Sequence, residues 1–176
     1  MVVLIGLMGT GKTTVGRKLA NFTGLKFVDS DEMIEARSGR KVREIFSELG
    51  ESEFRRLEAV ALGQACSDDV DIVLAVAGGA ILSRENRELL KSSTKNIVWL
   101  DASTPTLVER TGAGQHRPLL ADDPVGMLTK MRSDRESLYA EIATHKVVTE
   151  SRDADQVVAE IVRLCEIGDI AKAAKK

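Results

Sequence analysis

A glycine-rich segment near the start of the chain, Gly6-x-x-x-x-Gly11-Lys12-Thr13, limits the possible folds more than any other feature. The apolar run 2–5 before it is typical of a buried strand, and residues with helical spacing follow it. A strand, a glycine loop and a helix N-terminus in this order are the context in which the pattern forms a phosphate-binding loop. An ordinary glycine turn needs neither the full spacing nor the Lys-Thr pair. We therefore expect the segment to bind the phosphates of a nucleotide.

The chemistry of this loop follows from its residue types. Glycine has no Cβ, so backbone N–H groups can turn inward around phosphate oxygens, and the start of a helix adds further unpaired N–H groups. Lys12 is expected to reach the β- and γ-phosphates, and the Thr13 hydroxyl to bind Mg²⁺. The predicted nucleotide-binding residues of the loop are Gly9, Thr10, Gly11, Lys12, Thr13 and Thr14.

Composition excludes several classes of function. With 176 residues, 43% hydrophobic and 30% charged, the chain has the size and balance of one globular domain. A formal net charge of −2 gives no electrostatic footprint for nucleic acid, and no apolar run has membrane-spanning length. Cys66 and Cys165 lie far apart and are expected to be reduced. We expect a cytoplasmic monomer that binds neither nucleic acid nor a membrane.

Strand-like and helix-like segments alternate along the chain, which predicts a parallel sheet with helices on both faces. The predicted class is α/β, a three-layer α/β/α fold. Its five parallel strands are expected within the segments 2–5, 25–31, 71–76, 96–101 and 145–150. Residues 1–168 are predicted to form a single domain, and residues 169–176 a flexible C-terminal tail.

Capping residues mark the ends of the predicted helices. Glycines at 24, 39 and 50 are placed to end three helices, and a separate helix is expected over 52–66. The expected N-caps are Ser83, Thr104 (with Pro105 in the first helical position), Asp123 and Asp153, the last in a capping box with Gln156.

Five further motifs follow the glycine loop. They are Asp29-Ser30-Asp31 at the end of the second strand, EFRRLE at 53–58, AGGA at 77–80, RTGAGQHRPLL at 110–120 and RESLY at 135–139. In this order, and in a chain of this length, they resemble the shikimate kinase family from the first strand to the final helix. The resemblance implies a P-loop kinase architecture with Mg²⁺ as cofactor. It also implies transfer of the γ-phosphoryl group of ATP to the 3-hydroxyl of shikimate, in aromatic amino-acid biosynthesis.

The two acids of the first of these motifs match family positions with different roles. Asp31 is implied to accept hydrogen bonds from the substrate hydroxyls and to position, or deprotonate, the attacking one. Asp29 is implied to hold Mg²⁺, directly or through water. The alternative is that these acids only cap the following helix, a role that Ser30 or Asp31 could fill.

Arginines and glycines supply the implied contacts to the acceptor. Arg55 and Arg135 match the arginines that grip the substrate carboxylate, since a guanidinium fork fits a carboxylate. Arg56 should lie on a different helix face, because helix neighbours do not point together. Gly78 and Gly79 would let a backbone N–H approach the substrate, although glycines also serve simple strand-to-helix turns.

The polar segment at about 112–123 is predicted to be a lid, because a loop of this length in a compact domain is usually functional. Arg117 matches the lid arginine, which would bring a cation to the transferred phosphate as the loop closes. Arg110 and Arg152 match family positions that flank the adenine of ATP. Each of these arginines could otherwise be an ordinary surface charge.

One residue departs from the family pattern. Ala77 stands where the family usually has the first of three consecutive glycines, so its methyl group could strain the loop or crowd the substrate. Two other readings remain open from the sequence. One is a related kinase that phosphorylates gluconate or a nucleoside monophosphate, and the other is a nucleotide-binding relative without catalysis.

Overall fold

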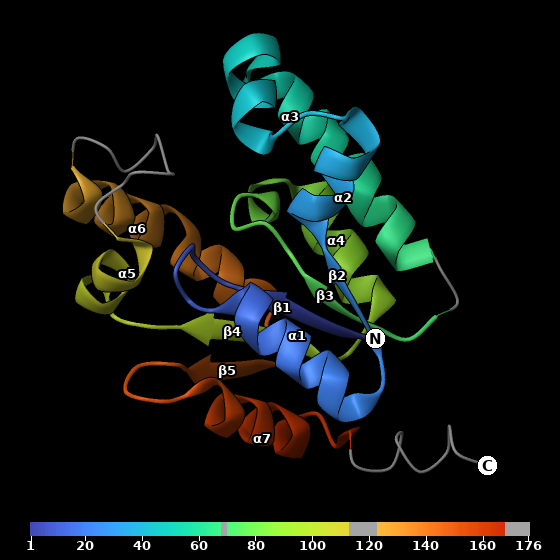
Figure 1. Cartoon of the computed structure of the whole chain (residues 1–176), viewed down its shortest axis with the longest axis vertical. Helices are drawn as coiled ribbons and strands as arrows, with labels where there is room; N and C mark the ends of the chain where they lie inside the picture. The colour runs from blue at the N-terminus through green and yellow to red at the C-terminus, as the bar shows by residue number, and fades with distance from the viewer. Residues whose placement is uncertain (68–69, 113–122, 168–176) are drawn as a thin grey trace.

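A twisted parallel sheet organises the molecule (Figure 1). The computed structural model describes residues 1–67, 70–112 and 123–167. Within them five parallel strands lie in the order β2-β3-β1-β4-β5. Their bounds are β1 Val2–Ile5, β2 Lys26–Asp29, β3 Ile72–Ala75, β4 Ile97–Asp101 and β5 His145–Val148. The predicted fold class is confirmed, whereas the predicted tail and residues 113–122 of the predicted lid lie outside the described residues.

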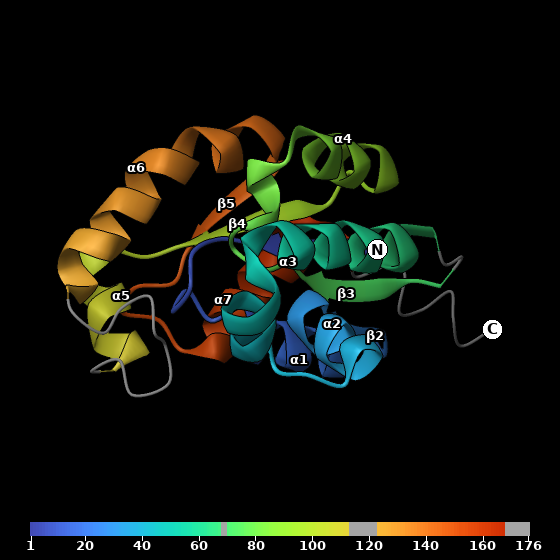
Figure 2. The ribbon, with the colours of Figure 1, turned by 90° about the horizontal axis from the view of Figure 1, so that it is seen from above.

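Helices cover both faces of the sheet, as the view from above shows (Figure 2). Helices α1 and α7 lie on one face, and α4 and α6 lie on the other. The helices are α1 Lys12–Thr23, α2 Ser30–Ser38, α3 Val42–Ser67, α4 Arg84–Ser93, α5 Thr104–Thr111, α6 Pro124–Ile142 and α7 Ala154–Leu164, with a short 3₁₀ turn, η1, at Ala80–Leu82.

The alternation of side chains along β1 explains why two cores form. Val2 and Leu4 belong to the core under α1 and α7, whereas Val3 and Ile5 belong to the core under α3, α4 and α6. All four residues are buried because β1 lies in the middle of the sheet and helices cover both of its faces. A central parallel strand must therefore be apolar at every position, which is why the run 2–5 could be recognised in the sequence.

The helix ends confirm most of the predicted caps. Gly24 and Gly39 adopt left-handed conformations after α1 and α2. The hydroxyl of Ser83 accepts a hydrogen bond from the backbone N–H of Asn86, and Asp123 caps α6 in the same way. Asp153 and Gln156 form the predicted capping box.

Two predicted boundaries differ from the structure. The N-cap of α5 is Ser103, not Thr104, because the extended backbone at Ser103 lets its hydroxyl accept from the N–H of Thr106. Pro105 consequently lies in the second helical position. The two helices expected over 41–66 run together as α3, with a kink at Gly50, where φ is 81° and ψ is 170°.

A lobe made of α2 and the first half of α3 projects beyond the edge of the sheet (Figure 1). Its own small core consists of Ile34, Ile45, Phe54 and Ala61. On the other side of the sheet's carboxyl edge stand α5 and the start of α6 (Figure 2). The space between these walls lies over the end of β1, where the chain order reverses between β3 and β4. Open parallel sheets bind their ligands at such a switch point.

Candidate active site

The glycine loop joins β1 to α1 at this switch point. Gly6, Gly9 and Gly11 have φ values of 141°, 82° and 90°, which residues with a Cβ rarely adopt. Gly11 is the N-cap of α1, so the first N–H groups of the helix have no side-chain cap. The Lys12 ammonium donates hydrogen bonds to the carbonyls of Gly6, at 2.9 Å, and Leu7, at 3.1 Å. The loop therefore has the backbone form that phosphate binding requires.

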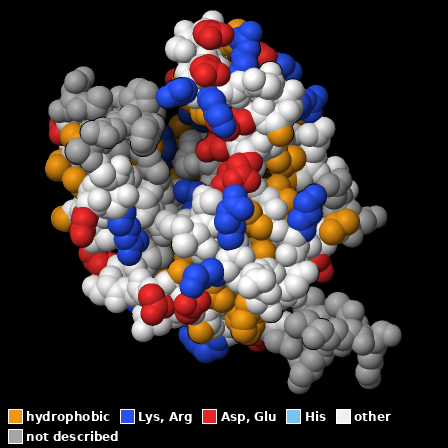
Figure 3. Space-filling model, viewed as in Figure 1, with side chains coloured by type: hydrophobic (Ala, Val, Ile, Leu, Met, Phe, Trp, Pro, Cys, Tyr) orange, Lys and Arg blue, Asp and Glu red, His pale blue; other side chains and the backbone are white. Residues whose placement is uncertain are grey.

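One large cavity, of about 1250 Å³, joins this loop to the lobe formed by α2 and α3. Figure 3 shows the hollow between the lobe and the α5–α6 side, with basic side chains around it. Every predicted site residue within the described ranges lines this cavity, while Arg117 lies outside them. They are Gly9, Thr10, Gly11, Lys12, Thr13, Thr14, Asp29, Asp31, Arg55, Gly78, Gly79, Arg110, Arg135 and Arg152.

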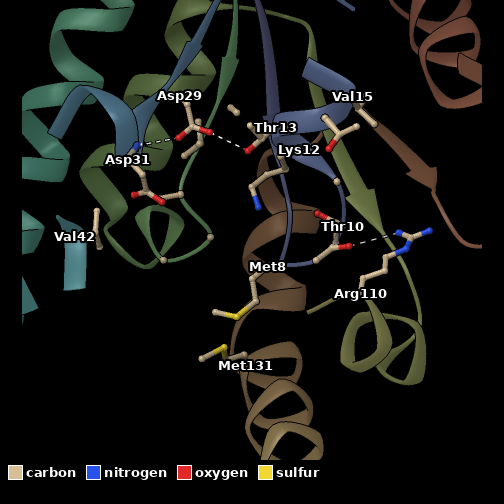
Figure 4. Close-up of a pocket in the computed structure, with 18 of the residues that line it drawn as sticks. Met8, Thr10, Lys12, Thr13, Val15, Asp29, Asp31, Val42, Arg110 and Met131 are labelled. Carbon is tan, nitrogen blue, oxygen red and sulfur yellow. Dashed lines mark hydrogen bonds between the residues drawn. The ribbon is translucent and has the colours of Figure 1, made fainter. Parts of the chain in front are cut away.

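Asp29 connects the glycine loop to the start of α2 (Figure 4). Its Oδ2 accepts a hydrogen bond from the Thr13 hydroxyl at 3.0 Å, and its Oδ1 accepts one from the Asp31 N–H at 3.0 Å. Asp29 is thus the N-cap of α2, so the alternative that these acids cap the helix holds for Asp29, whereas Ser30 and Asp31 do not fill that role. Asp29, the residue before the helix, has the extended backbone that an N-cap requires, whereas Ser30 and Asp31 are already helical.

The paired oxygens of Thr13 and Asp29 have the chemistry that Mg²⁺ prefers. Magnesium takes hard oxygen ligands and is usually held by one or two protein groups together with water and phosphate oxygens. Within residues 1–67, 70–112 and 123–167, no three acidic, histidine or cysteine side chains gather closely enough to hold a metal by themselves. The residues present fit an ion that is shared with a nucleotide.

Asp31 contributes a buried acceptor oxygen to the lining of the cavity. Its Oδ1 is buried and, in the described part of the chain, has no hydrogen-bond partner. Burial, and after it the nearby Asp29 carboxylate, raise the pKa of Asp31 to about 6, against the opposing charge of Lys12. A buried acceptor of this kind is what a substrate hydroxyl requires, and a pKa near neutrality suits a group that takes up a proton.

Arg55 is held in place by two acids of its own helix. Its guanidinium contacts Glu58 at 2.9 Å and Glu51 at 3.0 Å. Glu58 is only 1% exposed, and burial raises the pKa of this carboxyl while the charge of Arg55 lowers it. The neighbouring Arg56 points away and pairs with Glu53 on the surface, as predicted. The two arginines are adjacent in the chain, yet only Arg55 lines the cavity.

The loop after β3, which contains Gly78 and Gly79, lies directly against the predicted carboxylate-binding arginines. A Cβ at Gly79 would lie 2.6 Å from Nη1 of Arg55, which is too close for any real contact. A Cβ at Gly78 would lie 3.6 Å from Nη1 of Arg135 and 3.2 Å from the carbonyl oxygen of Gly6. The structure therefore brings both guanidinium groups and both glycines together at one end of the cavity.

Ala77 causes no backbone strain at this loop. The non-glycine residues with positive φ in the described ranges are Ser151 and Glu166, so Ala77 has a conformation that any L-residue can adopt. Its N–H donates a hydrogen bond of 2.9 Å to the Ser30 hydroxyl. The backbone strain that alanine could cause in place of the first glycine is therefore absent. Ala77 does line the cavity.

Arg110 and Arg152 lie at the phosphate end of the cavity. Arg110 donates to the side chain and carbonyl of Thr149, at 2.8 Å and 2.7 Å, and to the carbonyl of Gly9 at 3.5 Å. Arg152 pairs with Glu160 and donates to the carbonyl of Gln156. Both guanidiniums are thus held by hydrogen bonds, Arg110 against the glycine loop and Arg152 between β5 and α7.

Three residues that support the site were not found from the sequence. Two of them could have been found by helical spacing. Glu58 lies three positions after Arg55, and Tyr139 lies four positions after Arg135, so each shares a helix face with its arginine. The Tyr139 hydroxyl donates to the carbonyl of Gly78 at 2.9 Å. Ser30 gave no such signal, because its partner Ala77 is distant in the chain.

A phosphate-binding loop, an acid with a buried acceptor oxygen and two arginines around one cavity define a P-loop kinase that phosphorylates a small molecule. The family model for shikimate kinase matches residues 8–166. The shikimate kinase of Symbiobacterium thermophilum is 46% identical over 96% of this chain and 98% of its own, and that of Corynebacterium efficiens is 45% identical over 94% and 96%. The chain belongs to the shikimate kinase family.

Solved structures agree with this assignment. The shikimate kinase from Acinetobacter baumannii in complex with shikimate matches with a TM-score of 0.89 and 37% identity, over 94% of this chain and 92% of that one. A gluconokinase from Sinorhizobium meliloti, at 21% identity and a TM-score of 0.63 over 99% and 94% of the two chains, shares the fold alone. None of the helices in the described ranges is both long and apolar enough to cross a membrane.

Proposed function

We propose that the protein transfers the γ-phosphoryl group of ATP to the 3-hydroxyl of shikimate, which gives shikimate 3-phosphate and ADP for aromatic amino-acid biosynthesis. The observation that carries the proposal is the shared cavity, in which the glycine loop faces Arg55 and Arg135. A small carboxylated polyol needs guanidinium forks at one end and hydroxyl acceptors at the other. The relatives named shikimate kinase support this substrate over the others.

The acceptor is proposed to lie between α3, the β3 loop and α6. Its carboxylate binds the guanidiniums of Arg55 and Arg135 and approaches the backbone of Gly78 and Gly79, which is supported by the closeness of these four residues. Its hydroxyls face Asp31, whose buried Oδ1 accepts no hydrogen bond from the described part of the chain. The two ends of the cavity thus recognise the two ends of the substrate.

Phosphoryl transfer then depends on positioning and on stabilising charge. Asp31 orients the attacking hydroxyl and accepts its proton, for which a pKa of about 6 suits a base near neutral pH. Lys12 and the N–H groups of the glycine loop bind the phosphates. Mg²⁺, held by Thr13 and Asp29, would neutralise the charge of the phosphate oxygens.

The remaining predicted roles complete the proposal. Arg117 of the lid contacts the transferred phosphate, and Arg110 and Arg152 flank the adenine of ATP, which agrees with the position of the latter two on the cavity wall. We further propose that the protein acts as a monomer in the cytoplasm.

A coupled assay of ADP release tests the proposed function. The purified protein, with ATP and Mg²⁺, is given shikimate, gluconate or nucleoside monophosphates in parallel. We expect turnover with shikimate and a kcat/KM at least about a hundred-fold lower with the others, since positioned arginines discriminate against acceptors that lack the carboxylate in the right place. Preferred turnover of gluconate or a nucleotide would identify a related kinase. ATP binding without turnover of any acceptor would identify a non-catalytic relative.

A further inference from the structure

The loop after β3 must hold its backbone at a fixed place, because its glycines approach the acceptor. The sheet ladder between β2 and β3 ends at the pair Asp29 and Ala75. Beyond it, the N–H of Val76 donates to the carbonyl of Leu4 in β1 at 3.0 Å. The next N–H, that of Ala77, turns the other way and donates to the Ser30 hydroxyl at 2.9 Å. One side-chain oxygen therefore continues the connection between the ends of β2 and β3.

Ser30 is completely buried, at 0% exposure, and stands between Asp29 and Asp31 at the first turn of α2. A buried hydroxyl with a single main-chain partner has a definite position, and replacing it leaves a buried N–H without an acceptor. Because Asp31 follows Ser30 directly, any shift of the β3 loop relative to α2 also changes the separation between Asp31 and the glycines.

The opposite side of the same loop is held by α6. The buried Tyr139 donates its hydroxyl to the carbonyl of Gly78 at 2.9 Å, and burial raises the pKa of this phenol, so that it keeps the donated proton. The carbonyls of Ala77 and Gly79 accept from Ala80 and Leu82 in η1. In the described part of the chain, the N–H groups of Gly78 and Gly79 make no such bond and remain available to a ligand.

We propose that Ser30 is a positioning residue for the acceptor. Its hydroxyl sets the distance between the two ends of the acceptor site, with Asp31 at the hydroxyl end and the N–H groups of Gly78 and Gly79 at the carboxylate end. The proposal rests on the proposed function, because it assumes that these groups bind opposite ends of one small acid. Ser30 does not touch the acceptor itself, and it acts through Ala77.

The test compares Ser30→Ala with Ser30→Thr, which retains the hydroxyl. In Ser30→Ala, we expect the KM for shikimate to rise about ten-fold, in the range that the loss of one buried hydrogen bond produces. The KM for ATP should stay within about two-fold, since the phosphate loop is untouched. Ser30→Thr should restore most of the affinity for shikimate. Should Ser30→Ala not fold, Ser30→Cys keeps the volume with a weaker acceptor, and a smaller rise in the same KM is expected.

Thr144→Ala is the matched control. The Thr144 hydroxyl also accepts a hydrogen bond from a distant backbone N–H, that of Ile97 at 3.0 Å, but at the opposite edge of the sheet and away from the cavity. The Thr144→Ala substitution should lower the melting temperature without changing the KM for shikimate or for ATP. The inference about Ser30 is overturned if Ser30→Ala leaves the KM for shikimate unchanged or raises both KM values equally. In either case turnover by the unchanged protein still supports the proposed function, and its absence counts against that function instead.

Discussion

The two ends of the cavity are built in different ways. The phosphate end consists mainly of backbone from one continuous segment, in which positive φ at Gly6, Gly9 and Gly11 shapes the loop. The acceptor end consists of side chains and short backbone stretches from α2, α3, the β3 loop and α6. It is held by ion pairs and hydrogen bonds that link these elements, such as those of Arg55 with Glu58 and of Ser30 with Ala77.

Because the two ends are built differently, substitutions at one end should have different effects from substitutions at the other. A loop of backbone N–H groups recognises phosphate in any nucleoside triphosphate, and its shape depends largely on its glycines. Side chains gathered from several elements recognise one acceptor, and replacing one of them alters the selectivity while the phosphate end stays intact. We therefore expect substitutions at the acceptor end to act on the acceptor, and the following experiments test how cleanly the two ends separate.

The largest effect is expected where the two ends meet, at Asp31. Asp31→Asn keeps the shape of the side chain but removes the base, so kcat should fall about a thousand-fold while the affinity for ATP changes little. In the unchanged protein, kcat/KM should decline below about pH 6 as the Asp31 carboxylate takes up a proton. The variant should lack this acidic decline in a steady-state pH profile. Full activity of Asp31→Asn would remove Asp31 from proton transfer.

The same variant has a consequence for stability with a definite sign. The pKa of Asp31 is raised in the folded state to about 6, from an ordinary value of 3.8, so folding favours the protonated form. The favourable contribution is complete at low pH and is lost as the pH rises through about 6. Asp31→Asn should therefore increase the free energy of unfolding by about 2 kcal/mol near neutral pH and by almost nothing near pH 4. Urea titrations at the two pH values measure this.

The contrast between the two ends also explains what the sequence could predict. The phosphate loop was predictable because its residues are consecutive and its glycines have a backbone reason to be glycines. The strands β1 and β3 were predictable because central parallel strands are apolar throughout. At the acceptor end, Arg55 and Arg135 came from a resemblance, since either one alone reads as a surface charge. The bond between Ser30 and Ala77 joins residues whose proximity only the folded sheet creates.

The next effect in size separates two adjacent arginines. Arg55→Ala should raise the KM for shikimate about a hundred-fold, because a charge-assisted contact to the carboxylate is lost, with little change in the KM for ATP. Arg56→Ala is the matched control on the same helix turn. Arg56 pairs with Glu53 at the surface, where its side chain is 63% exposed, so its loss should change neither KM nor stability measurably.

Arg55→Ala also leaves the buried Glu58 without its cation. The pKa of Glu58, already raised by burial, should rise further, because Arg55 is the main group that lowers it. Glu58→Gln removes this uncompensated buried charge, so the double variant should be at least as stable as Arg55→Ala alone in thermal unfolding. Equal loss of affinity for shikimate in Arg55→Ala and Arg56→Ala would contradict the assignment of Arg55 to the carboxylate.

The smallest effects come from adding a single methyl group at two glycines. Gly79→Ala would place a Cβ 2.6 Å from the Arg55 guanidinium, so the flexible arginine must move, and the KM for shikimate should rise about ten-fold without a change for ATP. Gly63, in the second half of α3, has nothing within 4 Å of a Cβ, so Gly63→Ala should add up to about 1 kcal/mol of helix stability and leave both KM values alone. Steady-state kinetics and urea unfolding of the pair measure both. If Gly79→Ala weakened ATP and shikimate alike, the two ends of the cavity would be coupled through the β3 loop, and selectivity could not be adjusted at one end alone.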